Sequence, residues 1–367
     1  MKIVTIVGAR PQFIKAAVVS RAIREYNTTS KFPISEVIIH TGQHYDENMS
    51  QVFFDELNIS APDYNLDVCN ATHGAMTGRM LERIEEVLVE MRPDWVLVYG
   101  DTNSTLSGAL AAKKLHLKLA HVEAGLRSFN MKMPEEQNRL IADRLADLLF
   151  CPTDTAVSNL KREGIGDSAY AETVIKVGDV MYDSILYYSA ISDKKSSILK
   201  KLNIKQGEYV LSTIHRAENT DMPERLSDIM LALREIANQI TVVLPIHPRT
   251  KIILSDRNIR TDGVKIIDPI SYLDMIQLEK ESQAIITDSG GIQKEAYFFQ
   301  KPCITIRDET EWVELINANV NCLAGADKNN ILKVFDRFRN RKINFPSGLY
   351  GDGKAGEKIV EAVVNFE

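Results

Sequence analysis

The residues best suited to chemistry stand in the sequence IITDSGGIQKE at 285–295. Ala284–Thr287 is apolar and β-branched, which predicts a short buried strand. Ser289, Gly290 and Gly291 then form a turn of small residues, and the apolar spacing after them predicts a helix. The first amides of a helix have no partner within it, and the helix dipole adds about half a positive charge there. Because glycine lets an anion approach the backbone, this stretch predicts a phosphate site.

Two further residues extend this expectation from a phosphate to a nucleotide. Glu295 lies one turn into the helix, where its carboxylate could accept a hydrogen bond from a ribose hydroxyl. Arg307 follows the next apolar strand, Cys303–Ile306, and offers a cation for the phosphate. The alternative interpretation is a tight turn between a strand and a helix that binds no ligand.

In the first half of the chain, ionisable and polar side chains stand directly after predicted strands. These strands are Lys2–Val7, Glu36–Thr41, Trp95–Tyr99 and Lys118–Val122. The side chains that follow them are Arg10, Gln43, Asp101, Glu123 and Arg127. Functional groups of parallel sheets collect beyond the carboxyl ends of the strands, so we expect a cluster that also includes Lys15 and Glu135. Carboxylates that close repel one another, so at least one should have a raised pKa and act as an acid.

The three carboxylates also have structural interpretations. Glu123 could simply pair with Arg127, which lies on the same loop. Asp101 could cap the helix that begins near Ser104, a common role for aspartate in such a loop. Glu135 follows a proline at the start of its helix and could stabilise the first turn through the helix dipole.

Histidine and tryptophan residues offer weaker candidates for ligand contacts. His215 and His247 both follow predicted strands of the second half, and His215 is the stronger candidate of the two. Trp312 is interpreted as a core residue, with a sugar- or uracil-facing role as the alternative. The histidines interpreted as structural or surface residues are His44, His73, His116 and His121.

The elements that position these residues alternate between apolar strands and helices of about 10–15 residues, which predicts parallel sheets built from right-handed βαβ units. At 367 residues the chain should form two domains. The pattern restarts after Val177–Asp179, so we expect an N-terminal Rossmann-like domain over residues 1–178 and a C-terminal nucleotide-binding one over 179–352. We expect a cleft between the two and a final helix, about 353–367, that packs back on the first domain.

Composition and charge narrow the function classes. A formal charge of −6 and a pI near 5.8 argue against nucleic acid or an anionic membrane as the main partner. No apolar run reaches the roughly 18 residues that a membrane-spanning helix requires. The four cysteines form no CxxC pair, which favours reduced thiols, a cytoplasmic location and no structural metal. The turn after the first strand lacks the GxGxxG pattern, so a nicotinamide cofactor is not expected.

Seven short motifs make the sequence similar to a known family. They are GARPQ at 8–12, TGQH at 41–44, YGDTNST at 99–105, HVEAGLR at 121–127, PEEQNR at 134–139, TDSGGIQKE at 287–295 and YGDGKA at 350–355. Together they resemble the non-hydrolysing UDP-N-acetylglucosamine 2-epimerases. This resemblance implies the two-domain glycosyltransferase-B (GT-B) architecture and a homodimer. It also implies a UDP-linked 2-acetamido sugar as substrate and no cofactor.

The resemblance also implies a mechanism and roles for the candidate residues. UDP leaves and a carboxylate removes the C2 proton, which gives a 2-acetamido glycal. A proton is then delivered to the opposite face of C2, and UDP returns to C1. The expected acid–base residues are Asp101, Glu123, Glu135 and His215, with the face that each serves left open. The expected UDP contacts are Arg10, Lys15, His215, Ser289, Gly290, Gly291, Glu295 and Arg307. Possible contacts to the substrate or to a second, regulatory substrate molecule are Gln43, Arg127 and His247.

Three segments depart from the usual UDP-N-acetylglucosamine pattern. They are HRAENT at 215–220, PIHPR at 245–249 and RDETEWVEL at 307–315. Together with SFNM at 128–131, they look more like the branch that acts on UDP-2,3-diacetamido-2,3-dideoxy-glucuronate, in surface polysaccharide or glycan precursor synthesis. The alternative substrate is UDP-N-acetylglucosamine, with UDP-N-acetylmannosamine as product. The competing functions are a hydrolysing epimerase, a GT-B glycosyltransferase and a non-catalytic nucleotide sensor.

Overall fold

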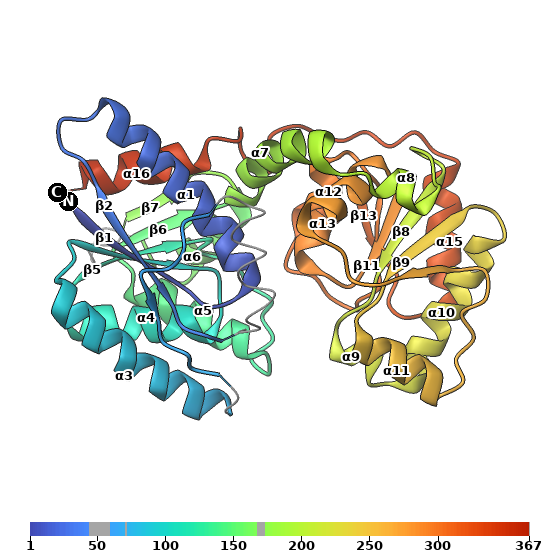
Figure 1. Cartoon of the computed structure of the whole chain (residues 1–367), viewed down its shortest axis with the longest axis horizontal. Helices are drawn as coiled ribbons and strands as arrows, with labels where there is room; N and C mark the ends of the chain where they lie inside the picture. The colour runs from blue at the N-terminus through green and yellow to red at the C-terminus, as the bar shows by residue number, and fades with distance from the viewer. Residues whose placement is uncertain (44–58, 70–71, 167–172, 367) are drawn as a thin grey trace. The chain divides into compact units, whose positions relative to one another are not determined.

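The computed structural model describes residues 1–43, 59–69, 72–166 and 173–366. His44 lies outside these residues, as does the segment 48–57, for which the sequence predicts a helix. The chain divides into two compact units, which we describe separately (Figure 1). Unit 1 comprises Met1–Leu186 and Gly348–Glu367, and unit 2 comprises Tyr187–Ser347. Within the described ranges, no helix combines the length and apolar character that crossing a bilayer requires.

Unit 1 is built on a parallel sheet. Its described part has seven strands in the order β3-β2-β1-β4-β5-β6-β7, and all of their pairings are parallel. The sheet extends toward both edges from the central neighbours β1 and β4. The ends of β1, β4 and β5 therefore lie side by side. The strands are β1 Lys2–Val7, β2 Ser35–His40, β3 Tyr64–Asn65, β4 Trp95–Tyr99, β5 Lys118–Val122, β6 Leu148–Cys151 and β7 Thr173–Lys176.

Helices follow most of these strands and begin close to the predicted residues. The helices of unit 1 are α1 Arg10–Thr29, α3 His73–Met91, α4 Asn103–Lys114, α5 Pro134–Leu145, α6 Asp154–Arg162 and α16 Ala355–Asn365. The C-terminal helix α16 lies beside α1 (Figure 1), where a Cβ on Gly356 would be 2.8 Å from Val18 Cγ1. A glycine at this position therefore allows the two helices to approach closely. The boundary between the units falls within α7 (Val180–Lys195).

Unit 2 repeats this design around a second parallel sheet. Its described strands follow the order β10-β9-β8-β11-β12-β13, with parallel pairing throughout. They are β8 Tyr209–Thr213, β9 Thr241–Pro245, β10 Lys265–Ile267, β11 Ala284–Thr287, β12 Cys303–Thr305 and β13 Asn321–Leu323. The helices are α8 Ile198–Leu202, α9 Ala217–Thr220, α10 Pro223–Ala237, α11 Pro248–Asp256, α12 Tyr272–Glu281, α13 Gly290–Phe298, α14 Val313–Asn317 and α15 Lys328–Arg339.

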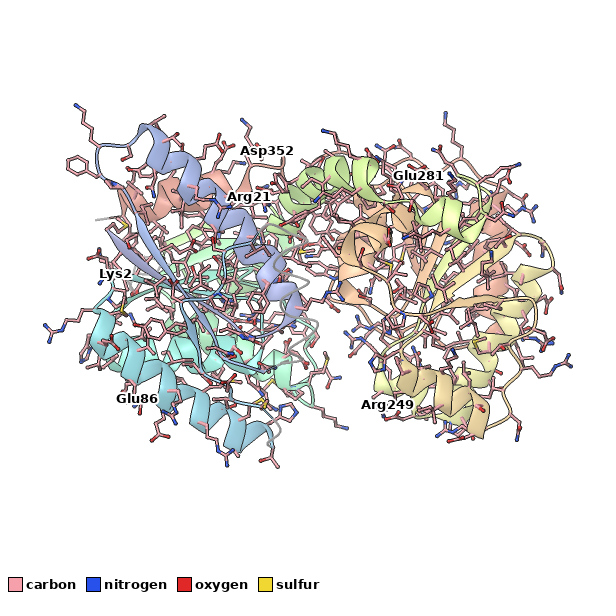
Figure 2. All side chains as sticks on the ribbon, in the orientation of Figure 1. Lys2, Arg21, Glu86, Arg249, Glu281 and Asp352 are labelled. Carbon is pink, nitrogen blue, oxygen red and sulfur yellow. The ribbon has the colours of Figure 1, made fainter. Side chains whose placement is uncertain are left out.

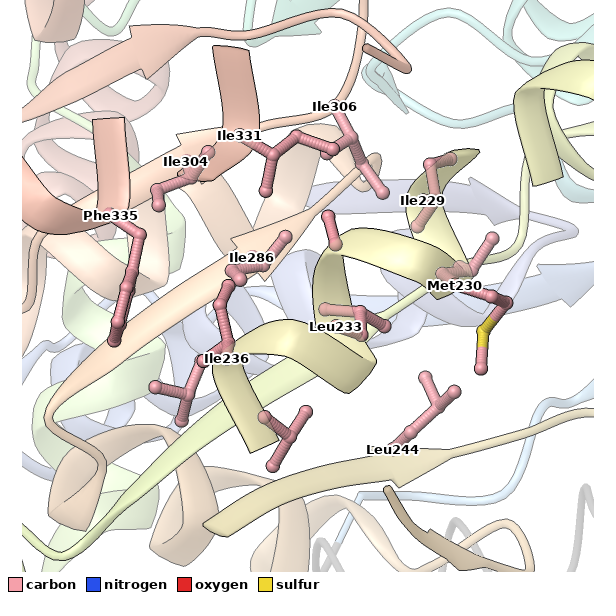
Figure 3. Close-up of a cluster of buried hydrophobic side chains, with 14 of the residues drawn as sticks. Ile229, Met230, Leu233, Ile236, Leu244, Ile286, Ile304, Ile306, Ile331 and Phe335 are labelled. Carbon is pink, nitrogen blue, oxygen red and sulfur yellow. The ribbon is translucent and has the colours of Figure 1, made fainter. Parts of the chain in front are cut away.

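The core of unit 2 fixes the position of β11, which carries the predicted phosphate turn. Ile286 of β11 and Ile304 of β12 are fully buried against Leu233 of α10 and Phe335 of α15 (Figure 3). Full burial of such side chains stabilises the fold by about 1.5–3 kcal/mol each. The carboxyl end of β11 is therefore held against a packed core on this face of the sheet.

The structure corrects the sequence prediction at one segment and adds three strands to it. The polar composition of residues 193–206 predicts a surface helix, but the structure has the end of α7, the short α8 and a turn in which Asn203 has φ of 50°. Strands β3, β7 and β13 were not predicted, because all three are short and contain half-buried residues that weaken the apolar signal.

Candidate active site

The predicted phosphate turn has the expected local structure. Strand β11 ends at Thr287, and the Ser289 side chain caps α13 by accepting a hydrogen bond from Ile292 N at 3.4 Å. Gly290 and Gly291 form the first turn of that helix, with Gly290 half-buried and Gly291 exposed. The helix N-terminus thus faces outward with glycine at the two leading positions, a geometry suited to an anion.

Asp288 connects this turn to the neighbouring strand end. Its carboxylate is fully buried and accepts hydrogen bonds from His215 N at 3.0 Å, Arg216 N at 3.1 Å and Asn219 Nδ2 at 3.1 Å. The segment after β8 is therefore fixed beside the segment after β11. This places the predicted ligand residue His215 next to the phosphate turn, although Asp288 itself was not identified from the sequence.

Arg307 lies at the end of β12 and is 1% exposed. Its Nη1 donates a hydrogen bond to Glu311 Oε2 at 3.0 Å. Its Nε is buried and makes no hydrogen bond to any described residue. The other oxygen of Glu311 would be 2.6 Å from a Cβ built on Gly290, so the Glu311 carboxylate lies against the phosphate turn. A carboxylate in this position marks the turn as a site that attracts negative charge.

Glu295, the predicted ribose contact, is 6% exposed and has a second buried carboxyl group as its neighbour. Glu279 of α12 is 1% exposed, and burial together with the nearby Glu295 raises the pKa of Glu279 well above its ordinary value. This shift favours the protonated form of Glu279 beside Glu295.

The two candidate histidines of unit 2 are electrostatic neighbours. Loss of hydration lowers the pKa of His215 from its ordinary value; Asp288 opposes this shift and His247 adds to it. Because the pKa of His215 lies below its ordinary value, the neutral form of this side chain dominates at pH 7. His247 caps α11, and its Nδ1 accepts a hydrogen bond from Arg249 N at 3.3 Å. The Arg249 side chain lies at the surface (Figure 2) and pairs with Asp221 at 2.8 Å.

In unit 1, Glu123 and Lys15 form an ion pair at the carboxyl end of the sheet. The side chains are 7% and 12% exposed, so both are mostly removed from water. Glu123 has φ of 73°, a left-handed conformation that a non-glycine residue adopts at a cost of about 1–2 kcal/mol. The structure therefore contradicts the alternative in which Glu123 simply pairs with Arg127.

Asp101 forms its ion pair with Arg139 of α5, a residue that was not identified as a candidate. Burial raises the pKa of Asp101, and it outweighs the opposing effects of Arg139 and Lys15; Glu123 adds a smaller increase. The expectation that one clustered carboxyl has a raised pKa is therefore met at Asp101, with burial as the larger cause. The helix after β4 is capped by Thr102, not by Asp101, which removes the capping alternative.

Arg127 is 5% exposed and is used within unit 1. Its guanidinium donates to Asp143 at 2.6 Å, to the Leu126 carbonyl at 2.6 Å and to both oxygens of Glu163 at 2.6 and 2.7 Å. Most of its donors are therefore already bound to protein acceptors, which disfavours the predicted contact of Arg127 with substrate or a regulatory ligand. Asp143 also bonds His121 Nδ1 at 2.7 Å, in keeping with the structural interpretation of that histidine.

The paired acids at the start of α5 have different environments. Glu135 is exposed in the first turn, whereas Glu136 is 1% exposed. Glu136 accepts hydrogen bonds from the Ser128 and Phe129 backbones at 2.9 Å and from Arg139 at 3.1 Å. Glu136 therefore holds the preceding loop in place, while the Glu135 side chain remains accessible to solvent.

Arg10 and Gln43 complete the predicted set in unit 1. Arg10 is exposed at the first position of α1. Gln43 Oε1 accepts hydrogen bonds from Ser104 N at 3.2 Å and Ser104 Oγ at 2.9 Å. Gln12, which was not identified, is 1% exposed; it accepts from Gly8 N and donates to the Tyr99 carbonyl, and so joins the ends of β1 and β4. Its position within the GARPQ motif is the sequence feature that could have identified Gln12.

Comparison with known proteins agrees with this arrangement. The family model described as UDP-N-acetylglucosamine 2-epimerase matches residues 27–364. The UDP-2,3-diacetamido-2,3-dideoxy-D-glucuronate 2-epimerase of Pseudomonas aeruginosa is 51% identical over 98% of this chain and 99% of its own. The UDP-N-acetylglucosamine 2-epimerase of Methanococcus maripaludis is 44% identical over 99% of this chain and 98% of its own.

A solved structure gives the same result for the fold. The crystal structure of Methanocaldococcus jannaschii UDP-GlcNAc 2-epimerase in complex with UDP-GlcNAc and UDP matches with a TM-score of 0.89 and 42% identity, over 99% of both chains. The predicted α/β fold with two doubly wound parallel sheets is thereby confirmed, as is the family resemblance drawn from the seven motifs. The chain therefore belongs to the UDP-N-acetylglucosamine 2-epimerase family, a family of isomerases that act on UDP-linked sugars.

Proposed function

We propose that the protein inverts C2 of a UDP-linked 2-acetamido sugar without hydrolysing it. The proposed substrate is UDP-2,3-diacetamido-2,3-dideoxy-glucuronate and the product is its manno epimer. The observation that carries this choice is the 51% identity, over 98% of the chain, to an enzyme named for that substrate.

The groups of unit 2 are suited to the UDP portion of the substrate. In this proposal the diphosphate binds the free amides at Gly290 and Gly291, with Ser289, Arg307 and neutral His215 around it. Glu295 accepts hydrogen bonds from the ribose hydroxyls, and Glu279, whose raised pKa favours its protonated form, lies beside it. Each charge-assisted hydrogen bond to the diphosphate would contribute about 1.5–3 kcal/mol, and more as negative charge develops on the departing UDP.

The groups of unit 1 are suited to proton transfer at C2. The C2 proton is not acidic in the substrate, because no carbonyl group is attached to that carbon. Departure of UDP creates an oxocarbenium-like centre at C1 that makes this proton labile, and a carboxylate then removes it to give the glycal. Asp101, whose pKa is raised, suits the donor of a proton, and Glu123 with its Lys15 partner suits an acceptor.

Glu135 and Arg10 are the accessible charged groups of this set, and we propose that they contact the substrate directly. Gln43 and His247 remain proposed contacts for a second substrate molecule. We also propose a homodimer in the cytoplasm, where UDP-linked precursors of glycans would be made. Closure of the protein around the substrate would keep the glycal and UDP from escaping into water.

The alternative substrate, UDP-N-acetylglucosamine, is favoured by the 44% identity to an enzyme of that name. The deciding experiment supplies each sugar nucleotide separately to the purified protein in D₂O and follows it by proton NMR. Deuterium at C2 with the UDP linkage intact supports the proposal, and the faster substrate decides between the two sugars. Release of free sugar would indicate a hydrolysing epimerase. Transfer of the sugar to an acceptor would indicate a glycosyltransferase. Binding of both nucleotides without turnover would indicate a sensor.

A further inference from the structure

The loop between β5 and α5 presents an aromatic side chain in an unusual backbone conformation. Phe129 has φ of 58°, in the left-handed region that a bulky residue rarely adopts. The same residue is 74% exposed, so burial of its ring in the protein core does not account for the conformation. Backbone conformations of this kind persist where the surrounding structure enforces them, and they concentrate at ligand sites.

Hydrogen bonds to one buried carboxylate enforce the conformation. Glu136 Oε1 accepts from Phe129 N at 2.9 Å, and Glu136 Oε2 accepts from both Ser128 N and Ser128 Oγ at 2.9 Å. The Ser128 hydroxyl in turn accepts from Asn130 N at 3.3 Å. The loop is therefore held in one shape before any ligand binds, with Phe129 projecting from it into solvent.

The same carboxylate connects the loop to the proposed catalytic acid. Arg139 donates from Nη1 to Glu136 at 3.1 Å, and its Nη2 pairs with Asp101. Arg139 is 5% exposed, so this connection lies within the body of unit 1. The backbone of Phe129 and the side chain of Asp101 are thus both held by one buried Glu136–Arg139 pair, which connects the loop that carries the ring to the acid.

We propose that the Phe129 ring packs against the acetamido group at C3 of the substrate and makes Phe129 a specificity-determining residue. This inference rests on the proposed function and adds a residue to it. A 3-acetamido group differs from a 3-hydroxyl by a planar amide and a methyl group, and both pack well on an aromatic face. The loop sequence SFNM at 128–131 is also one of the segments that resemble the branch acting on the diacetamido uronate.

The test compares three substitutions at one position. Phe129→Ala removes the ring, Phe129→Gly removes it and also suits the left-handed backbone, and Phe129→Tyr keeps an aromatic face. We expect Phe129→Ala and Phe129→Gly to lower kcat/KM for the diacetamido uronate by roughly 10- to 100-fold, the range for losing one apolar contact in a specificity pocket. The loss should lie mainly in KM, and Phe129→Tyr should restore most of the activity.

Two controls separate the ring from general effects. Phe32→Ala removes a ring that is 82% exposed on the turn between α1 and β2, and it should change neither substrate's kinetics. UDP-N-acetylglucosamine lacks the 3-acetamido group, so Phe129→Ala should change its kcat/KM by less than about threefold. The affinity for UDP alone should be unchanged in every variant.

Several outcomes would overturn the inference while leaving the proposed function intact. They are equal losses for both sugars, unchanged kinetics in Phe129→Ala, or recovery in Phe129→Gly, which would assign the effect to backbone strain. Wild-type protein that turns over neither sugar would instead overturn the proposed function. Wild-type protein that uses UDP-N-acetylglucosamine alone would overturn the substrate assignment and this inference together.

Discussion

Replacing Gly290 with alanine should weaken UDP binding by roughly 10- to 100-fold while the protein still folds. A Cβ at this position would lie 2.6 Å from Glu311 Oε1 and 3.6 Å from Trp312 Nε1. Glu311 ends in a flexible side chain, so it can move aside, but its ion pair with Arg307 is then disturbed. The new methyl group would also stand at the helix amides proposed for the diphosphate.

The magnitude follows from the loss of one charge-assisted contact. Such a hydrogen bond contributes about 1.5–3 kcal/mol, and each 1.4 kcal/mol corresponds to a tenfold change in affinity. Isothermal titration of UDP into the wild type and Gly290→Ala measures the difference directly. Thermal unfolding of both proteins shows whether the fold is retained.

A second helical glycine supplies the matched control. Gly78 lies within α3 of unit 1, and a Cβ there would meet no atom of the described residues within 4 Å. Gly78→Ala should therefore leave the affinity for UDP unchanged. Equal UDP affinity in Gly290→Ala and the wild type would refute the placement of the diphosphate at this turn.

The remaining predictions concern the acids, helix α3 and one buried carboxyl group. Asp101→Asn and Glu123→Gln should each lower kcat by roughly 10²–10⁴-fold, the range for losing a general acid or base, while the affinity for UDP changes by less than about threefold. Steady-state kinetics and UDP titration measure the two quantities. Unimpaired turnover in both variants would contradict the assigned roles. Gly78→Ala should raise the free energy of unfolding by about 0.5–1 kcal/mol, because alanine favours a helix interior more than glycine does. Urea unfolding of both proteins measures this difference. A loss of stability would contradict the open surroundings of Gly78. Burial raises the pKa of Asp183 from 3.8 to about 6, although its carboxylate accepts a hydrogen bond from Gly356 N at 2.9 Å. Since the folded-state pKa lies above the unfolded value, ionisation destabilises the fold as pH rises from about 4 to 6. Asp183→Asn should therefore raise stability by about 1–2 kcal/mol at pH 7.5 and by little at pH 4, and a gain that is equal at both pH values would exclude this cause.

The sequence predicted the strands that carry the site, because they are continuous apolar runs in a buried parallel sheet. Trp95–Tyr99, Lys118–Val122 and Ala284–Thr287 have the predicted bounds. The Ser289 cap and the glycine turn could also be predicted, since they depend on residues that are neighbours in sequence. Short strands with half-buried residues, such as β7, carry too weak an apolar pattern to be recognised.

The pairing of side chains within the site could not be predicted from the sequence. Lys15 and Glu123 are separated by 108 positions, and Asp101 and Arg139 by 38. Nearby sequence partners such as Arg127 suggested the wrong pairing for Glu123. Only the three-dimensional arrangement shows that Arg127 is occupied by Asp143 and Glu163. Local spacing therefore indicated which residue types gather at the strand ends, while the tertiary fold decided their partners.

The most direct test of the central claim follows the bond between the sugar and UDP during epimerisation. The substrate is prepared with ¹⁸O in the oxygen that bridges C1 and the β-phosphorus, and the purified protein is monitored by ³¹P NMR. If UDP leaves and returns, the label should move into non-bridging positions of the β-phosphate in the recovered UDP-sugar, at a rate comparable to C2 inversion. Inversion at C2 with all of the label still in the bridging position would contradict an elimination mechanism.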